Sequence, residues 1–267
     1  MADASGTILL VGCGKMGGAM LAGWRDAGRA VAVVEPRGAI PDPSSLVAHV
    51  ATPDALPADL SPAAVVLAVK PQDAPAVVPD YARFAPTAVF LSIMAGRTVR
   101  SLSALLGGAA RIVRAMPNTP AAVRRGMTVA CAGAGVSEAE RLLCESLLCA
   151  IGTVAWVEQE GLLDPVTAVS GGGPAYVFLL AELLEEAAVA EGIPRPLARL
   201  IARETVAGSG ALLAATDEDA AVLRKNVTSP GGTTAEALAV LMAQDAWPAL
   251  IRRAIGAATA RSRALAG

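Results

Sequence analysis

The feature that most constrains the fold is a glycine-rich hexapeptide placed between an apolar run and an amphipathic segment. Residues Thr7 to Val11 have the composition of a short buried strand, and Gly12-Cys13-Gly14-Lys15-Met16-Gly17 follows at once. Helical periodicity then runs from Met16 to Asp26 and stops before Gly28. Strand, G-x-G-x-x-G turn and helix are the context of a dinucleotide site, because the glycines permit a tight turn, close approach of a pyrophosphate and close helix–strand contact.

The end of the next apolar run supports this interpretation. Ala30 to Val34 leads into Glu35, about 20 residues beyond the turn, where an acid that binds the ribose hydroxyls is expected. Glu35 should repel a 2′-phosphate and favour NADH, whereas Arg37 can pair with that phosphate and favour NADPH. Arg37 is equally well explained as a solvated loop charge. The sequence therefore predicts NADPH or NADH as cofactor and leaves the choice open.

Apolar runs continue through the first part of the chain and alternate with several helical patterns. Further strands are predicted at residues 64–69, 88–93, 111–115 and 127–132, with an edge strand at 153–157. Helical patterns at residues 98–106 and 137–151 separate some of them. Continuous apolar strands are buried on both faces, so the expected fold is α/β, a Rossmann-type doubly wound parallel sheet covered by helices. The Pro- and Asp-rich stretch 35–61 has no regular pattern.

Polar groups directly after two predicted strands are expected at the carboxyl edge of this sheet, where ligands bind in such folds. Lys70 and Pro71 follow the third strand, and Asn118 lies in a loop stiffened by Pro117 and Pro120 after the fifth. A surface lysine at a strand end is an equally good explanation of Lys70. The predicted cofactor contacts are Gly12, Gly14, Lys15, Met16, Gly17, Glu35, Arg37, Lys70, Pro71 and Asn118.

Beyond about residue 160 the strand signals stop and the chain has helical patterns throughout. These patterns cover residues 162–169, 174–191, 194–215, 219–226, 234–242 and 246–265. The change predicts two domains, a dinucleotide-binding domain of residues 1–160 and an all-helical domain of residues 161–267. The glycines of Ser170-Gly171-Gly172-Gly173-Pro174 precede its long second helix and permit close approach of a ligand or of another helix.

A turn that feeds a helix in this second part can hold an anion. Pro230 fixes φ, Gly231 and Gly232 allow close approach, and the first N–H groups of the next helix lack intrahelical partners. A small carboxylate would satisfy them, with hydroxyls from Thr233 and Thr234 beside it. The alternative is that these hydroxyls only cap the helix.

Composition excludes several classes of function. With 22 Lys and Arg against 24 Asp and Glu, the net charge of −2 gives no basic field for nucleic acid. The longest uncharged run, residues 165–181, is broken by three consecutive glycines, so no membrane span and a soluble chain are expected. The start lacks the pattern of a signal peptide, so cytoplasmic localisation is expected.

The sequence also has no motif typical of a metal site or of a catalytic nucleophile. Cys13, Cys131, Cys144 and Cys149 have no metal-like spacing and are expected to be buried thiols, and no metal is predicted. The one histidine, His49, has no partner acid nearby and is not expected to be catalytic. An enzyme with this sequence should therefore rely on its cofactor for the chemistry.

Taken together and in order, the motifs resemble those of the pyrroline-5-carboxylate reductase family. They are the hexapeptide at 12–17, Val69-Lys70-Pro71, Arg114-Ala115-Met116-Pro117-Asn118-Thr119-Pro120, Ser170-Gly171-Gly172-Gly173-Pro174-Ala175-Tyr176 and the segment from Asn226 to Thr234. The hexapeptide is shared with many dehydrogenases, whereas the last two motifs are much more specific. Two departures are small: Gly172 stands where Ser is frequent, and Thr233 where Ala is frequent.

The resemblance implies NAD(P)H-dependent reduction of 1-pyrroline-5-carboxylate to L-proline, the last step of proline biosynthesis. It implies a helical domain that binds substrate and interleaves with its partner in a dimer, or in a ring of dimers. Thr234 resembles the hydroxyl that bonds the ring nitrogen, and Asn226 the amide near substrate and nicotinamide; these two are the predicted catalytic residues. The substrate carboxylate would lie among Ser229, Gly231, Gly232 and Thr233.

Two other functions are compatible with the sequence. A β-hydroxyacid dehydrogenase shares the two-domain plan and needs a lysine in the second domain, where Lys225 is available. A non-catalytic dinucleotide-binding protein is the other, although it has no need of Asn226, Ser229 and Thr234. Activity on a hydroxyacid, or NAD(P)H binding without turnover, would distinguish these two from the imine reductase.

Overall fold

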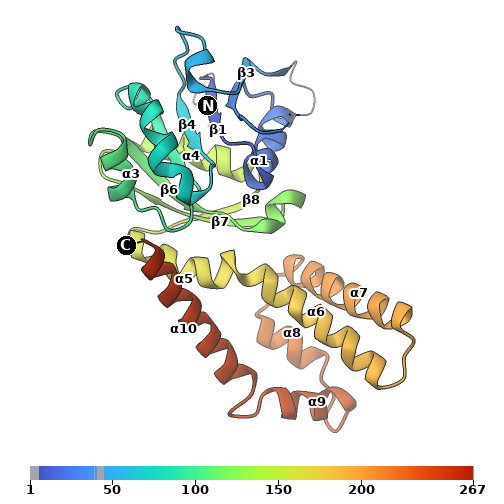
Figure 1. The fold of residues 1–267 in the computed structure, drawn as a ribbon. Coiled ribbons are helices and arrows are strands. Elements are labelled where there is room, and N and C mark those ends of the chain that lie inside the picture. Colours follow the sequence, from blue (N-terminus) through green and yellow to red (C-terminus); the bar gives the residue numbers. More distant parts are fainter. Residues whose placement is uncertain (1–5, 39, 41–44, 267) are drawn as a thin grey trace. The chain divides into compact units, whose positions relative to one another are not determined.

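The computed structural model describes residues 6–38, 40 and 45–266 (Figure 1). The chain forms two compact units. One comprises the described residues up to Gly171 together with those from Ala258 onward, and the other comprises Gly172–Ala257. The domain boundary expected at residue 160 remains a prediction.

The first unit is built on one mostly parallel sheet. Within the described residues the strand order is β3-β2-β1-β4-β5-β6-β7-β8. Their bounds are β1 Ile8–Val11, β2 Val31–Val34, β3 Ala48–Val50, β4 Ala64–Leu67, β5 Val89–Ser92, β6 Arg111–Met116, β7 Gly126–Ala132 and β8 Gly152–Trp156. The order 3-2-1-4-5-6 of the first six strands is that of a doubly wound dinucleotide-binding fold.

Successive strand residues point to opposite faces of the sheet, and both faces are buried under helices. Ile8 and Leu10 pack on one face with Trp24 and Leu147, which come from α1 (Lys15–Asp26) and α4 (Glu138–Cys149). Leu9 and Val11 pack on the other face, where α2 (Ala74–Val77), the 3₁₀ segment Val78–Phe84 and α3 (Val99–Leu105) cover the sheet. This double burial explains the continuous apolar strands.

The structure differs from the sequence expectation at two strands. β3 lies in the stretch expected to be irregular, and its three residues, with exposed His49 at the centre, carry no apolar run. β7 runs antiparallel to β6 because the short 3₁₀ segment Thr119–Val123 joins them in place of a crossover helix. β8 is parallel to β7 across α4. The sheet is thus parallel except at the β6–β7 pair.

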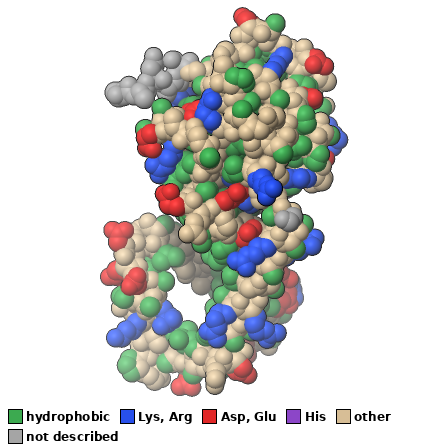
Figure 2. Space-filling view, turned by 90° about the vertical axis from the view of Figure 1, so that its left-hand side faces the viewer, with side chains coloured by type: hydrophobic (Ala, Val, Ile, Leu, Met, Phe, Trp, Pro, Cys, Tyr) green, Lys and Arg blue, Asp and Glu red, His purple; other side chains and the backbone are tan. Residues whose placement is uncertain are grey.

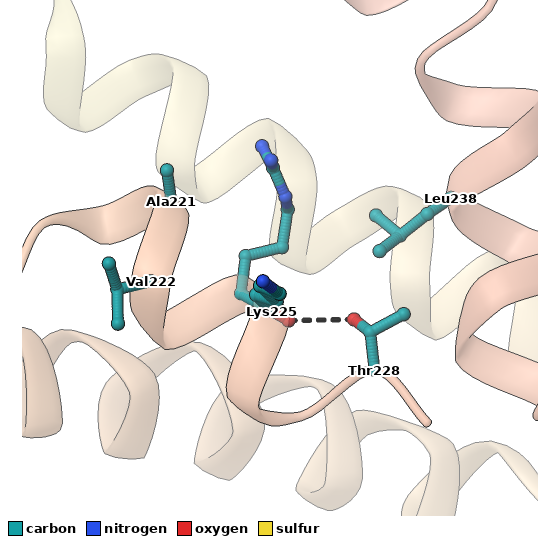
Figure 3. Close-up of a pocket in the computed structure, with 6 residues that line it drawn as sticks. Ala221, Val222, Lys225, Thr228 and Leu238 are labelled. Atoms are coloured by element: carbon teal, nitrogen blue, oxygen red, sulfur yellow. Dashed lines mark hydrogen bonds between the residues drawn. The ribbon is translucent and has the colours of Figure 1, made fainter. Parts of the chain in front are cut away.

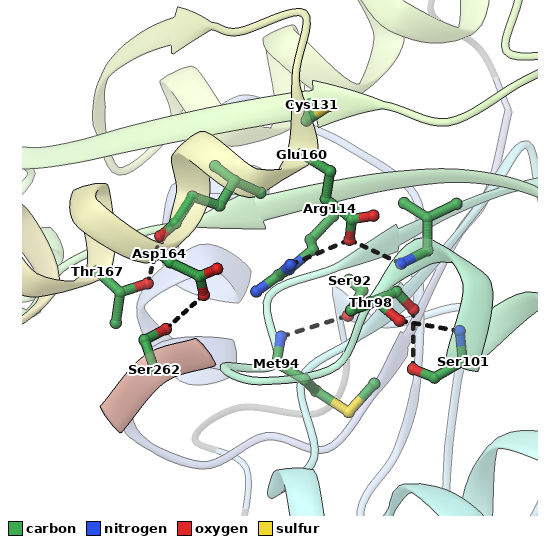
Figure 4. Close-up of polar contacts among 12 residues, drawn as sticks. Ser92, Met94, Thr98, Ser101, Arg114, Cys131, Glu160, Asp164, Thr167 and Ser262 are labelled. Carbon is green, nitrogen blue, oxygen red and sulfur yellow. Dashed lines mark hydrogen bonds and ion pairs between the residues drawn. The ribbon is translucent and has the colours of Figure 1, made fainter. Parts of the chain in front are cut away.

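Polar contacts tie the segment after β8 to the sheet (Figure 4). Arg114 on β6 is buried and donates to Glu160 at 3.0 Å, and the same carboxylate oxygen accepts from the Val99 N–H at the start of α3. Asp164 in α5 (Leu163–Val166) accepts from the Ser262 hydroxyl at 2.7 Å. Ser262 belongs to α10 (Trp247–Ala266), so the end of the C-terminal helix is part of the first unit.

The second unit is helical in its described residues, as expected. It contains α6 Gly173–Ala190, α7 Arg195–Ala214, α8 Ala220–Asn226, α9 Thr233–Leu241 and the first part of α10. No residue of α6 is buried, and Phe178 is 67% exposed. Hydrophobic side chains are visible on the surface of this unit (Figure 2). Exposed apolar area on this scale marks an interaction surface.

Candidate functional site

The candidate cofactor residues gather at one edge of the sheet. β1, β2, β4, β5 and β6 are mutually parallel, so the loops that follow them share the carboxyl edge. β1 has β2 on one side and β4 on the other, which makes the end of β1 the topological switch point where ligands bind. The predicted contact residues in the first unit all lie in these loops or at the start of α1.

The glycine turn has the geometry that a pyrophosphate requires. Gly12 has φ +89°, a backbone conformation that residues with side chains rarely adopt. Gly17 has no room for a side chain, because a Cβ there would lie 2.4 Å from the Gly12 carbonyl oxygen. A Cβ on Gly14, by contrast, would meet nothing within 4 Å, so this face of the turn is open. α1 begins here without a side-chain cap, which leaves its first N–H groups available to an anion. The residues present fit a dinucleotide.

Glu35 is held in place by the turn itself. Its carboxylate accepts from the Cys13 N–H at 2.6 Å and from the Arg37 N–H at 2.7 Å. The acid therefore stands beside the pyrophosphate turn at the end of β2, where a ribose would lie. The Arg37 side chain is exposed, and within the described residues it makes no ion pair.

The surroundings of the Cys13 thiol in this turn disfavour its ionised, nucleophilic form. Partial burial raises the pKa of Cys13, and the nearby Glu35 charge adds to the effect. Burial likewise raises the pKa of Cys144 to about 12. All four thiols were expected to be buried, and this expectation is wrong for Cys149, which is exposed.

The loops after β4 and β6 are fixed by side chains. Lys70 is exposed, and the carbonyl of the adjoining Pro71 accepts from Arg97 Nε at 2.8 Å. Asn118 uses both ends of its amide: Oδ1 accepts from the Met127 N–H at 2.9 Å, and Nδ2 donates to Ser170 Oγ at 3.2 Å. Arg97 and Ser170 were not predicted as site residues. Ser170 belongs to the motif from Ser170 to Tyr176, but no local pattern in the sequence predicts that it contacts Asn118.

The second unit places the predicted substrate residues on one turn. Asn226 ends α8, Gly231 has φ +67°, and Gly232 is the N-cap of α9. No side chain caps α9, so the alternative that Thr233 and Thr234 serve as caps is wrong. Within residues 45–266 the hydroxyls of Ser229, Thr233 and Thr234 make no hydrogen bond, and all three residues are exposed. The turn offers free N–H and hydroxyl donors to an anion.

A pocket of about 450 Å³ adjoins this turn (Figure 3). Arg224, Lys225 and Thr228 line it from the end of α8 and the following turn, and Leu238 lines it from α9. The Thr228 hydroxyl donates to the Arg224 carbonyl oxygen at 2.6 Å, so this side chain serves the turn. The pocket walls carry positive charge, which suits an acidic small molecule nearby.

Comparisons with known proteins identify relatives of both parts of the chain. Residues 160–265 match the family model described as pyrroline-5-carboxylate reductase dimerisation. Residues 7–96 match the model described as NADP oxidoreductase coenzyme F420-dependent. The chain is 35% identical over 264 residues to the pyrroline-5-carboxylate reductase of Pseudomonas aeruginosa, covering 97% of this chain and 96% of that one.

Solved structures show the same similarity. The structure of a pyrroline-5-carboxylate reductase from Coxiella burnetii superimposes with a TM-score of 0.90 at 33% identity, covering 98% of this chain and 99% of that one. The Plasmodium falciparum pyrroline carboxylate reductase, solved with NADP bound, gives a TM-score of 0.83 at 26% identity over the full length of both chains. The chain belongs to the pyrroline-5-carboxylate reductase family, whose members are NAD(P)H-dependent oxidoreductases.

Proposed function

We propose that this chain reduces the cyclic imine 1-pyrroline-5-carboxylate to L-proline, with NAD(P)H at the carboxyl edge of the sheet and the imine on the turn from Asn226 to Thr234. The observation that carries the assignment of substrate residues is the uncapped N-terminus of α9 beside three free hydroxyls. A hydroxyacid dehydrogenase has no comparable support, because full-length relatives and the dimerisation model carry the name pyrroline-5-carboxylate reductase.

In the proposed cofactor site, each residue has a separate task. Gly12, Gly14, Gly17 and the first N–H groups of α1, at Lys15 and Met16, hold the pyrophosphate. Glu35 accepts from the ribose hydroxyls, and Arg37 pairs with a 2′-phosphate when one is present. Lys70, Pro71 and Asn118 form the side of the site toward the nicotinamide. When bound, the dinucleotide supplies the hydride.

The substrate carboxylate is assigned to the start of α9. The N–H groups of Thr233 and Thr234 have no intrahelical partner, and the helix dipole favours an anion there. Ser229 and Thr233 add hydroxyl donors, while Gly231 and Gly232 let the backbone approach. Binding an anion at this point fixes one end of the ring and thereby orients the imine carbon.

The imine nitrogen is assigned to Thr234 and Asn226. A protonated imine is already electrophilic, so the protein needs to orient it, exclude water and stabilise the nitrogen as its charge changes. The Thr234 hydroxyl can bond that nitrogen from the first turn of α9. Asn226, at the end of α8, offers an amide for the substrate.

Replacing Thr234 by Val tests this assignment, since the two side chains are nearly isosteric. Loss of a hydrogen bond to a charging nitrogen should lower kcat by about 10- to 100-fold. The dissociation constant of NADPH, measured by calorimetry, should stay near normal. Thr233→Val serves as the matched control and should raise KM for the imine more than it lowers kcat. An unchanged kcat in Thr234→Val removes Thr234 from the mechanism.

The reaction itself is tested by following the absorbance loss of NADH and NADPH in parallel with racemic pyrroline-5-carboxylate. Consumption of either cofactor that depends on the imine supports the proposal and reports the cofactor preference. Binding of both cofactors without turnover would refute it.

The matched dimerisation model indicates that the chain self-associates. No membrane span was expected from the sequence, yet the segment Glu160–Ala190 is long and apolar enough to cross a bilayer by length and composition only, with a mean hydropathy of 1.3. Only 6% of its apolar 18-residue stretch is buried. The dimerisation model supports a second copy of the chain as the partner that buries this apolar segment. We therefore assign an interleaved dimer, or a ring of dimers. Cytoplasmic localisation stays a prediction from the sequence.

A further inference from the structure

The loop after β6 contains a side-chain pair of which only Asn118 has a place in the proposed cofactor site, whereas its partner Ser170 has none. Asn118 follows the last residues of β6, and Ser170 lies in the π-helical turn Thr167–Gly171. The two residues are far apart in sequence, yet Asn118 Nδ2 lies 3.2 Å from Ser170 Oγ. π-helical turns occur frequently at functional sites.

The hydrogen bonds fix the direction of this contact. Asn118 Oδ1 accepts from the Met127 N–H at 2.9 Å, and a backbone N–H can only donate, so the carbonyl end of the amide must face Met127. The NH₂ end therefore faces Ser170. Because an NH₂ group only donates, Ser170 Oγ is the acceptor in this pair. Within the described part of the chain, the Ser170 proton has no acceptor.

The position of this free donor points to the nicotinamide half of the cofactor site. The π-helical turn lies against the end of β6, since a Cβ on Gly171 would lie 3.0 Å from Met116 Cε. β6 ends at the carboxyl edge, on the side of the switch point opposite β2 and Glu35. Glu35 marks the adenosine ribose, so the loops after β4, β5 and β6 face the nicotinamide.

We propose that Ser170 donates a hydrogen bond to the carboxamide oxygen of the nicotinamide, and that Asn118 is a positioning residue that keeps the Ser170 proton free for this bond. The inference rests on the proposed cofactor site. Half-burial of both side chains limits competition by water. A fixed carboxamide fixes the rotation of the ring, and with it the direction in which its reactive carbon points.

Two variants separate the donor from the residue that positions it. Ser170→Ala removes the hydroxyl. Asn118→Asp keeps the acceptor for the Met127 N–H but turns the other end into an acceptor, so that Ser170 must donate to it and loses its free proton. Each variant should weaken NADPH and NADH binding by about tenfold, as loss of one hydrogen bond does. Ser170→Thr keeps the hydroxyl and should retain affinity within about threefold.

Calorimetry without substrate supplies the readout. ADP-ribose and its 2′-phosphate lack the nicotinamide, so their dissociation constants should be unchanged in both variants. The double variant should bind NADPH no more weakly than Ser170→Ala, because both changes remove the same bond. Loss of kcat in Ser170→Ala should exceed any rise in KM for the imine.

Three results would overturn the inference. They are unchanged NADPH affinity in Ser170→Ala, equal losses for NADPH and ADP-ribose, and additive losses in the double variant. Equal losses would identify a structural role, and additivity would show that Asn118 acts independently. Since these measurements require no turnover, failure of the imine reduction assay leaves the inference standing, and failure of the binding test leaves the reductase activity standing.

Discussion

At the scale of single residues, the charge at the end of β2 sets the balance between the two cofactors. Glu35 cannot readily turn away from a 2′-phosphate, because the Cys13 and Arg37 N–H groups hold its carboxylate. Arg37 stands two residues on with an exposed guanidinium. The two side chains therefore act in opposite directions on NADPH, whereas on NADH only Glu35 acts, by accepting from the ribose hydroxyls.

Glu35→Gln should raise kcat/KM for NADPH relative to NADH by about tenfold, because it removes repulsion between a carboxylate and a phosphate at short range. Arg37→Ala should shift the same ratio the other way. The ratio is obtained from initial rates with each cofactor at saturating imine. If it stays constant in both variants, the end of β2 does not select the cofactor.

At the scale of elements, α4 depends on its first turn. Ser137 and Glu140 form a reciprocal capping box, and Glu140 also accepts from Arg111 of β6, so one carboxylate ties the helix to the sheet. Burial raises the pKa of Glu140, but the hydrogen bonds from Ser137 and Arg111 outweigh it and hold the pKa below its ordinary value. The folded state therefore favours the ionised carboxyl.

Glu140→Gln should lower the free energy of unfolding by about 1 kcal/mol at pH 7, a typical cap contribution. Because the folded pKa is depressed, this contribution is complete above the unfolded glutamate pKa of about 4.3 and is lost as the pH falls further. Urea unfolding of both proteins across this range measures the difference. The control Glu138→Gln, at an exposed pair with Arg141, should change stability by less than about 0.5 kcal/mol. A pH-independent difference would rule out the ionised cap.

At the scale of the whole molecule, the exposed apolar helices require a partner. Phe178 is 67% exposed on α6, inside the segment that matches the dimerisation model. Val123 is 72% exposed on the 3₁₀ segment between β6 and β7, outside that match. Only the first of these two apolar side chains is expected to lie in an interface.

Phe178→Asp should raise the dissociation constant of the dimer by at least about 100-fold, since it removes roughly 2–3 kcal/mol of apolar burial in each copy and buries a charge. Light scattering over a dilution series gives the mass. The matched variant Val123→Asp should keep the mass of the wild type. A wild-type mass of one chain at working concentration would contradict the assigned dimer.

Most of the fold could be predicted because its signals are local. The continuous apolar strands, the helical periodicity beyond residue 160 and the glycine turn each depend on neighbouring residues, and the structure confirms the sheet followed by helices. β3 escaped prediction because Ala48, His49 and Val50 are held by pairing with β2 and carry no pattern of their own.

The sequence by itself determined the family, the dinucleotide turn and the residues expected to hold substrate, since these are written as contiguous motifs. Only the tertiary structure decided what depends on distant partners. It anchored Glu35 on the glycine turn, reversed β7, left α9 uncapped and turned the amide of Asn118 toward Ser170. The physical reason is that hydrogen-bond direction and side-chain orientation are set by packing between segments far apart in the chain, which no local pattern records.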